Sequence, residues 1–243
     1  GATITYTITV ADANDQTPTY TATSTTPTVT EGATAVDTNV AITDTDTGDS
    51  NTCTRGGADA ALFTCTVSAT AYSVAFTSSP NYDSGTACAA GNTCVVTIKI
   101  NDGAQDGATI TYTITVADAN DQTPAVTVDS SYATAEATTV FQTFTMVDTD
   151  TTGTYDCTLG GADSAAFSRT VTGKNCVVSW ASARDYDAAH ADANGDGTYV
   201  LTIAFTDGTN NLGAQSTDVT VTDVNDQTPT YTATSTTPTV TEG

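Results

Sequence analysis

The sequence predicts an all-β fold made of tandem seven-stranded Greek-key β-sandwiches joined end to end. An acidic string, Asp-x-Asn-Asp-Gln-Thr-Pro, begins at Asp12, Asp118 and Asp223, so the repeat intervals are 106 and 105 residues. Intervals of this length are typical of one β-sandwich domain. Threonine abounds while the helix formers Leu, Lys and Glu are scarce, which favours strands over helices.

Apolar residues that alternate with threonine predict the strands in order. The alternation begins at Ile4, Tyr6 and Ile8, and the same letters recur from Ile110 onward. Clusters of Gly, Asp and Asn separate these segments, as expected for turns between strands. The predicted strands are residues 3–10, 93–100, 110–116, 140–146, 199–205 and the segment around Val219 and Val221.

The repeated string also sets the domain boundaries. Proline lacks a backbone N–H and fixes its own φ, so the string ends one hydrogen-bonded ladder and we place a boundary after each proline. Residues 1–18 repeat 107–124 letter for letter, and 225–243 repeat 14–32, which indicates a window onto a longer array. The expected parts are the last strand and linker of a preceding repeat (1–18), two complete repeats (19–124 and 125–229) and the start of a following repeat (230–243).

The charge is strongly acidic and unevenly placed. Acidic residues outnumber basic ones 28 to 5, giving a net charge of −23, although charged residues are only 14% of the chain. The negative charge is therefore concentrated in a few places, and no basic patch is present to bind nucleic acid. No apolar run approaches the length of a membrane span.

Six cysteines without a Cys-x-x-Cys or Cys/His pattern favour disulfides and an extracellular setting. The second repeat holds only Cys157 and Cys176, which pair with each other or remain free. Cys157 and Cys53 each precede a Gly-Gly-Ala-Asp motif, which favours a bond from Cys53 to the nearby Cys65. Cys88 and Cys94 would then close a small loop. The sequence leaves the connectivity in the first repeat open.

Further acidic residues recur at matching places in the repeats. They are Glu31, Glu136 and Glu242; Asp44-Thr45-Asp46 and Asp148-Thr149-Asp150; Asn81-Tyr82-Asp83 and Asp185-Tyr186-Asp187; and Asp102-Gly103 and Asp207-Gly208. Together with the repeated string, these motifs resemble the cadherin repeat, in particular the cadherin-like repeats of bacterial surface proteins. The resemblance covers both complete repeats and keeps the order of the motifs.

The resemblance implies a shared site for three Ca²⁺ ions at each seam between repeats. At the middle seam the implied ligands are Glu31, Asn81, Asp83, Asp118, Asn120, Asp121, Asp148, Asp150 and Asp207. The first seam would use Asp12, Asn14, Asp15, Asp44, Asp46 and Asp102, and the last Glu136, Asp185, Asp187, Asp223, Asn225 and Asp226. At Asn81 the sequence departs from the aspartate that the family prefers, and the loss of this charge would weaken the binding of one ion.

Charge arithmetic supports the middle site independently of the family. Its seven carboxylates roughly balance three divalent cations, and calcium selects six to eight oxygen ligands per ion. Without metal, carboxylates this close would repel one another and raise their pKa values. Each motif taken singly is also typical of an ordinary turn, and only several motifs in register indicate a metal site.

Two other features point to less specific chemistry. The segment Asp192-Ala193-Asn194-Gly195-Asp196-Gly197 opens like a calcium loop, but Ile203 stands where the bidentate glutamate belongs, so a hairpin turn is the alternative. His190, the single histidine, has no nucleophile in register with it. Trp180 and Phe76 occupy matching positions and are expected to fill the sandwich cores.

The sequence therefore predicts a non-enzymatic, extracellular segment of a long adhesin or surface filament, stiffened by calcium. Its expected partners are neighbouring copies of the same repeat, head to tail or in a homo-oligomeric filament. Two alternatives stay open. One is a module that binds carbohydrate or cell surfaces, which a cluster of exposed aromatic residues would favour, and the other is the accessory domains of a large secreted hydrolase.

Overall fold

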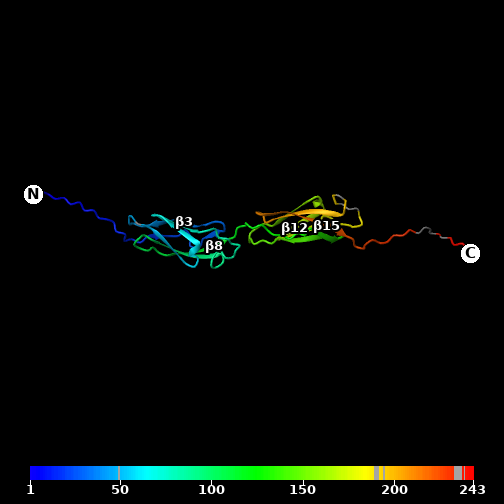
Figure 1. Ribbon diagram of the computed structural model, residues 1–243, viewed down its shortest axis with the longest axis horizontal. Helices are drawn as coiled ribbons and strands as arrows, with labels where there is room; N and C mark the ends of the chain where they lie inside the picture. Colours follow the sequence, from blue (N-terminus) through cyan, green and yellow to red (C-terminus); the bar gives the residue numbers. More distant parts are fainter. Residues whose placement is uncertain (49, 189–191, 194, 233–236, 238) are drawn as a thin grey trace. The chain divides into compact units, whose positions relative to one another are not determined.

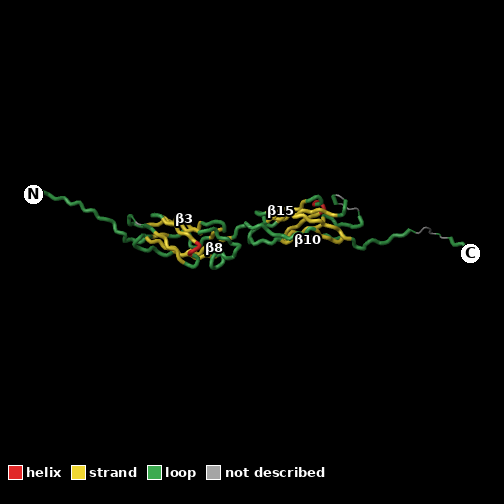
Figure 2. Tube along the Cα trace, in the orientation of Figure 1, coloured by secondary structure: helices red, strands yellow, loops and turns green. Residues whose placement is uncertain are grey.

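A computed structural model describes residues 1–48, 50–188, 192–193, 195–232, 237 and 239–243. Within this part of the chain the secondary structure is almost entirely β (Figures 1 and 2). Contacts divide the chain into two compact units: Gly1–Gln122 with Thr149–Gly153, and Thr123–Asp148 with Thr154–Gly243. Among the described residues, no helix is long and apolar enough to cross a membrane.

The first unit is a sandwich of two four-stranded sheets, ordered β1-β3-β6-β5 and β2-β8-β7-β4. All neighbours pair antiparallel except β2 and β8, which run parallel. Pro27 precedes β2, and the first strand of the repeat is divided so that each half joins a different sheet. The strands are β1 Thr19–Tyr20, β2 Thr28–Thr30, β3 Ala35–Thr43, β4 Thr52–Gly56, β5 Phe63–Val67, β6 Ala71–Phe76, β7 Thr93–Asn101 and β8 Ile110–Ala117, with a short 3-10 turn η1 at Ala60–Leu62.

The second unit repeats this plan with a three-stranded sheet β10-β13-β12 and a four-stranded sheet β11-β14-β15-β9. The counterpart of β1 is reduced to a single bridge between Ala125 and Val147, which leaves seven strands among the described residues of this unit. They are β9 Ser131–Ala135, β10 Val140–Thr145, β11 Asp156–Gly160, β12 Phe167–Thr172, β13 Asn175–Trp180, β14 Thr198–Thr206 and β15 Asn211–Thr222, with η2 at Ser164–Ala166. The predicted all-β sandwich fold is confirmed.

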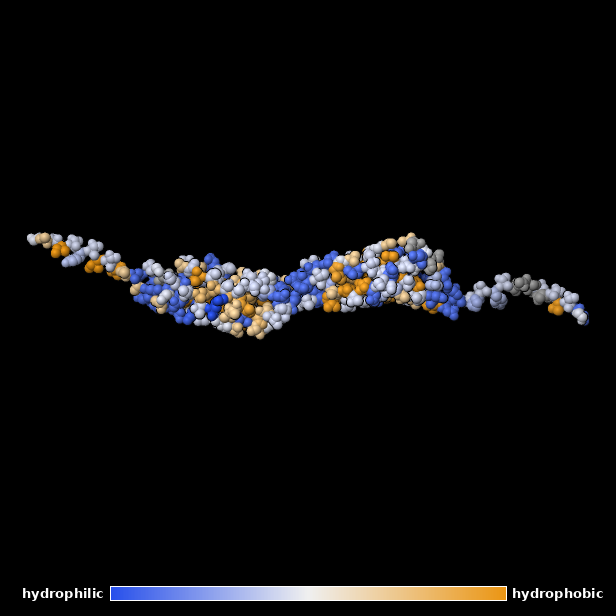
Figure 3. All heavy atoms as spheres, in the orientation of Figure 1, coloured by the Kyte–Doolittle hydropathy of each residue, from blue (hydrophilic) through white to orange (hydrophobic). Residues whose placement is uncertain are grey.

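The predicted strands correspond to β7, β8, β10, β14 and β15, with ends that differ by two residues or fewer where a range was predicted. Residues 3–10 are the exception, because they form no strand although their letters are those of β8. β8 lies between β7 and β2, and its Ile114 is completely buried, whereas Ile8 is 84% exposed and no described strand pairs with its segment. Figure 3 shows apolar side chains, in orange, exposed along the N-terminal segment. Alternation predicts a strand only where a ladder partner is available.

Each sandwich has its own apolar core between the sheets. In the first, Phe63 and Phe76 are paired across β5 and β6 with ring centroids 4.4 Å apart. In the second, Phe167 and Trp180 occupy the matching pair at the same 4.4 Å separation. Phe76 and Trp180 are buried, so the prediction that they fill the cores is confirmed.

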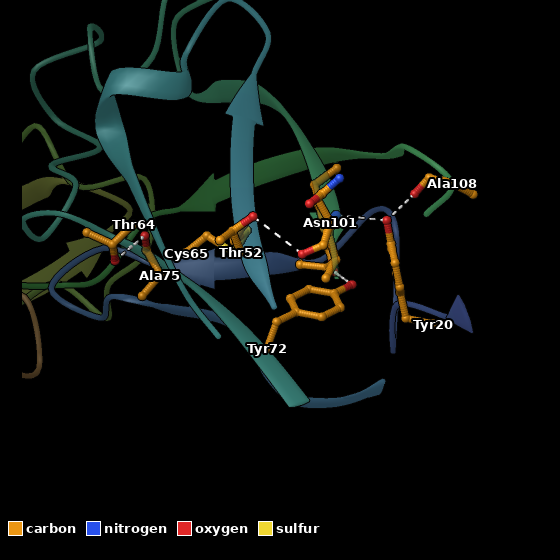
Figure 4. The surroundings of a disulfide bond; sticks show 11 residues. Tyr20, Thr52, Thr64, Cys65, Tyr72, Ala75, Asn101 and Ala108 are labelled. Atoms are coloured by element: carbon orange, nitrogen blue, oxygen red, sulfur yellow. Dashed lines mark hydrogen bonds between the residues drawn. A yellow bond between two sulfur atoms is a disulfide. The ribbon is translucent and has the colours of Figure 1, made fainter. Parts of the chain in front are cut away.

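All six cysteines form disulfides, and the pairing favoured by the repeat alignment is confirmed: Cys53–Cys65, Cys88–Cys94 and Cys157–Cys176. The Cys53–Cys65 bond joins β4 and β5, the edge strands of the two sheets. Figure 4 shows its surroundings, where the Tyr20 hydroxyl donates to the Ala108 carbonyl oxygen. Such a bond stabilises a sandwich chiefly by restricting the unfolded chain.

The Gly-Gly-Ala-Asp motif explains a bend that both repeats share. Gly57 has φ +92°, and a Cβ there would meet the Val95 carbonyl oxygen at 2.9 Å, so only glycine fits. The turn aims the buried Asp59 carboxylate at two backbone N–H groups, those of Ala89 and Val95, each at 2.7 Å. In the second unit Asp163 accepts from Ala193 and Val200 in the same way.

Replacing Asp59 by alanine is expected to lower the free energy of unfolding of the first unit by about 2–4 kcal/mol, because two buried N–H groups lose their acceptor. Urea denaturation of the whole chain measures the change. Asp129→Ala, at an exposed carboxylate, is the control and should shift stability by less than about 0.5 kcal/mol. Equal effects of the two substitutions would contradict this role for Asp59.

Candidate metal centre

Glu31 follows β2 directly and is buried, with 7% of its surface exposed. Its carboxylate accepts the N–H of Tyr82 at 2.7 Å and the N–H of Ala119 at 2.9 Å. The first donor belongs to the acidic turn after β6 and the second to the repeated string after β8. Glu31 therefore ties two loops together at one end of the first unit.

The acidic turn places Asp83 next to this glutamate. Asn81 shapes the turn, since its side-chain oxygen accepts the N–H of Ser84 at 2.8 Å. Both carboxylate oxygens of Asp83 are buried and accept no hydrogen bond within the described structure. A buried carboxylate without donors is costly unless a cation compensates it.

The repeated string is held by a short segment that precedes β11 in sequence but clusters with the first unit. Asp150, 1% exposed, accepts the N–H of Gln122 at 2.9 Å. The backbone N–H of Thr151 donates to Asp118 at 2.6 Å, and the Thr151 hydroxyl donates to the same oxygen. These contacts bring Asp118 and Asp150 to the Asp83 turn.

The result is a cluster of five carboxylates. Oxygen atoms of Glu31, Asp83 and Asp118 lie within 4.8 Å of one another, and so do those of Asp83, Asp121 and Asp150. Asp83 is common to both groups. An all-oxygen set that contains a buried carboxylate without N–H donors fits Ca²⁺, which takes hard oxygen ligands.

The electrostatics agree with this geometry. Burial, followed by the nearby carboxylates of Glu31 and Asp150, raises the pKa of the Asp83 carboxyl above its usual value. In the second unit, burial and the carboxylates of Asp223 and Glu136 raise the pKa of the Asp187 carboxyl in the same way. Both groups therefore favour a proton, or a metal ion, that would cancel their charge.

The predicted residues of the first seam also lie in the first unit. Asp46 accepts the N–H groups of Asp15 and Gln16, both at 2.7 Å, as Asp150 does for Gln122. Asp12 accepts both N–H and hydroxyl of Thr47, which lowers the pKa of the Asp12 carboxyl.

Asn14 donates its side-chain amide to the Asp102 carbonyl oxygen at 3.2 Å. Hydrogen bonds, chiefly from the Gln105 N–H, lower the pKa of the Asp102 carboxyl. Asp44 accepts the N–H of Asp46 at 3.1 Å, and its other oxygen is buried without a hydrogen-bond donor in the described structure. The first string is thus built like the second.

The second unit carries the counterpart of the Glu31 arrangement. Glu136, 5% exposed, accepts the N–H of Tyr186 at 2.7 Å and the N–H of Val224 at 2.6 Å. Oxygen atoms of Glu136, Asp185 and Asp187 lie within 4.8 Å of one another. Asp226 is among the carboxylates that raise the Asp187 pKa. The ligand roles of Asn120 and Asn225 stay predictions.

Asp148 and Asp207 of the second unit also approach within 4.8 Å. Asp207 is fully buried, and one of its oxygens accepts the N–H groups of Thr209 and Asn210 at 2.8 and 2.7 Å. These bonds hold the carboxylate in the loop between β14 and β15.

Comparison with solved structures identifies the fold. The chain is similar to mouse cadherin-23 repeats EC22-24, at 21% identity and a TM-score of 0.62, covering 87% of this chain and 68% of that one. Human protocadherin-24 EC1-2 matches at 19% identity and a TM-score of 0.58, covering 85% and 99%. The chain has the fold of cadherin extracellular repeats.

A cis-dimer structure of protocadherin γB7 EC3-6 also matches, at 17% identity and a TM-score of 0.55, and there the match covers 85% of this chain but 48% of the other. No family model matches the sequence, and no curated protein does. A special likeness of these cadherin-like units to bacterial surface proteins stays a prediction.

Two sequence features fall partly or wholly outside the described residues of the cadherin-like units. His190 and Asn194 both lie outside them. In the loop that contains Asn194, Asp192 accepts the N–H of Asp196 at 2.8 Å, as in a turn. The possible calcium loop there stays a prediction.

Sequence reasoning missed the residues that support the carboxylates. Thr47 and Thr151 each donate twice to the first aspartate of a repeated string, and Asp59 and Asp163 hold the loop that follows the acidic turn. The signals were present, because Asp-Thr-Asp-Thr and Gly-Gly-Ala-Asp both recur in the two repeats. Their donors and acceptors lie about 30 residues or more away in sequence, where a local pattern gives no information.

Asp83→Asn is expected to have opposite effects with and without calcium. In a chelator at neutral pH it should raise the Tm of the first unit, since it removes a charge that the folded state disfavours. With calcium it should reduce the stabilisation, since a charged ligand is lost. Calorimetry in both buffers tests this, with Asp129→Asn as the control, and a lower Tm in chelator would contradict it.

The same raised pKa predicts a pH dependence of the metal-free protein. Because folded Asp83 and Asp187 bind a proton more readily than the unfolded chain does, their contribution to stability should rise as the pH falls through their raised folded pKa values towards the ordinary aspartate value. Asp12 and Asp102, whose pKa values are lowered, act oppositely. Their ionised carboxylates stabilise the folded state, and this contribution is lost as the pH falls through their folded pKa values. A Tm measured in chelator that falls steadily from neutral pH would contradict this.

Proposed function

We propose that this chain is a calcium-stiffened, non-enzymatic segment of an extracellular tandem-repeat protein, a long surface adhesin or filament. The observation that carries the proposal is the pair of carboxylate groups that share Asp83. Their members come from four separate places in the sequence: residue 31, residue 83, the string at 118–121 and residue 150. One ion bound there would fix four loops at once.

The proposed mechanism is mechanical. Without metal the clustered carboxylates repel one another, although hydrogen bonds from backbone and threonine donors help to hold the loops that carry them. Calcium replaces repulsion by attraction to a common centre. Because Asp121 belongs to the middle repeated string and Asp150 to the sequence of the second repeat, binding would restrict the freedom of the linker between the repeats 19–124 and 125–229.

The extracellular setting is supported by the three disulfides, which persist in oxidising surroundings. The likeness to cadherin extracellular repeats supports the same setting. Partners of the chain would be further copies of the repeat, head to tail, with lateral association as a second possibility. Among the described residues of the two sandwiches, Tyr186 is the one large aromatic residue that stands out as exposed, so no aromatic platform favours carbohydrate binding.

Calcium is expected to bind the whole chain and to restrict the motion of the linker. Isothermal titration should detect binding, and small-angle scattering should show a more rigid particle in millimolar calcium than in chelator. The triple variant Asp83→Asn, Asp121→Asn, Asp150→Asn should lose roughly tenfold or more in affinity at the first-unit site, because calcium affinity follows ligand charge.

The matched control is Glu136→Gln with Asp187→Asn, which removes two carboxylates from the second unit and leaves the first-unit site unchanged. If wild-type protein binds no calcium, the proposal fails. If it binds calcium but the scattering is unchanged, calcium binding stands and the mechanical role fails.

A further inference from the structure

The loop between β6 and β7 contains a second feature, a small hairpin closed by the Cys88–Cys94 disulfide. Cys88 and Gly91 exchange backbone hydrogen bonds of 2.7 and 3.1 Å across the hairpin. Gly91 has φ +75°, a conformation that glycine adopts without strain. Both cysteines are buried in the core, so the covalent bond fixes the hairpin to the sandwich.

Two further contacts hold the hairpin in place. The buried Asp59 carboxylate accepts the N–H of Ala89 within the hairpin and that of Val95 just beyond it. On the other side, the Asn92 carbonyl oxygen accepts the N–H of Val116 in β8 at 2.8 Å. The hairpin is thus fixed by a disulfide, a buried carboxylate and the sheet.

From this fixed position the hairpin reaches the acidic turn. The Asn92 side-chain amide donates to the carbonyl oxygen of Tyr82 at 3.1 Å. The N–H of the same tyrosine donates to Glu31. Tyr82 is therefore held through both its carbonyl oxygen and its N–H group. It directly precedes Asp83, the residue that both carboxylate groups share.

We propose that the Cys88–Cys94 hairpin positions the acidic turn through Asn92, so that the calcium affinity of the first-unit carboxylate group depends on this disulfide. The inference rests on the proposed calcium binding. Cys88, Cys94 and Asn92 act as positioning residues, since none of them offers an oxygen to the ion. Groups that orient metal ligands commonly change affinity by tenfold or more when removed.

The second unit provides an internal comparison. Its Asp163 accepts from Ala193 and Val200, so the loop around Gly195 occupies the place of the hairpin. Gly195 has φ +74°, which matches Gly91. No cysteine is present in that loop, because Asp192 stands at the position of Cys88. Calcium affinity at the Glu136 group should therefore not change when the Cys88–Cys94 disulfide is removed.

The test uses the whole chain, labelled with ¹⁵N and titrated with calcium chloride. The amide N–H groups of Tyr82 and Tyr186 donate to Glu31 and Glu136, so their NMR shifts report the two sites separately in one titration. In the variant Cys88→Ala/Cys94→Ala, the apparent Kd at Tyr82 should rise roughly tenfold while that at Tyr186 is unchanged. Asn92→Ala should weaken binding at Tyr82 in the same direction with all disulfides intact.

The control is Cys53→Ala/Cys65→Ala, which removes the disulfide between β4 and β5 of the same unit and leaves the Cys88–Cys94 bond and Asn92 unchanged. It should lower stability towards urea but leave the Kd at Tyr82 within about twofold. An unchanged Kd at Tyr82 in both hairpin variants would overturn the inference, and so would an equal rise in the control. If neither wild-type amide responds to calcium, the proposed function itself fails.

Discussion

The arrangement of the acidic loops depends on one constraint: several negatively charged carboxylates are held close together by hydrogen-bond donors that do not neutralise their charge. Glu31 accepts two backbone N–H groups, from Tyr82 and Ala119, and these bonds fix where the loops cross. Asp83 receives no such bond in the described structure. Its charge is left uncompensated by the protein, so the loops are ordered around a position that favours a cation.

The rest of the sandwich does not share this constraint. The strands are rich in threonine, their inner faces form apolar cores, and each unit has a disulfide that links two of its strands. Because the acidic residues are concentrated in loops, folding of each core and repulsion among the carboxylates are largely separate problems. This separation would allow the calcium proposed above to act on the loops while the sandwiches remain folded.

The two repeats also differ in the side-chain links that they form at matching positions. Arg169 stands in β12 where Cys65 stands in β5, as the pairings with Val178 and Val74 show. In the second unit this arginine forms an ion pair with Asp156 at 2.5 Å, in partly exposed surroundings where such a pair contributes little. The disulfide of the second unit instead joins Cys157 of β11 to Cys176 of β13. Shared backbone geometry therefore tolerates different side-chain links, provided that the glycine turns and buried aspartates remain.

The sequence by itself determined the all-β class, the repeat length, the positions of the longest strands and the residue types of the acidic loops, because alternation and repetition are local properties of the chain. It also indicated the disulfides once the two repeats were aligned. Only the tertiary structure decided that residues 3–10 form no strand while identical residues form β8, since a strand exists through its partners. Likewise, only the fold could show that Asp83 is shared by two carboxylate groups and that Asn92 supports its turn, because those contacts depend on where distant loops meet.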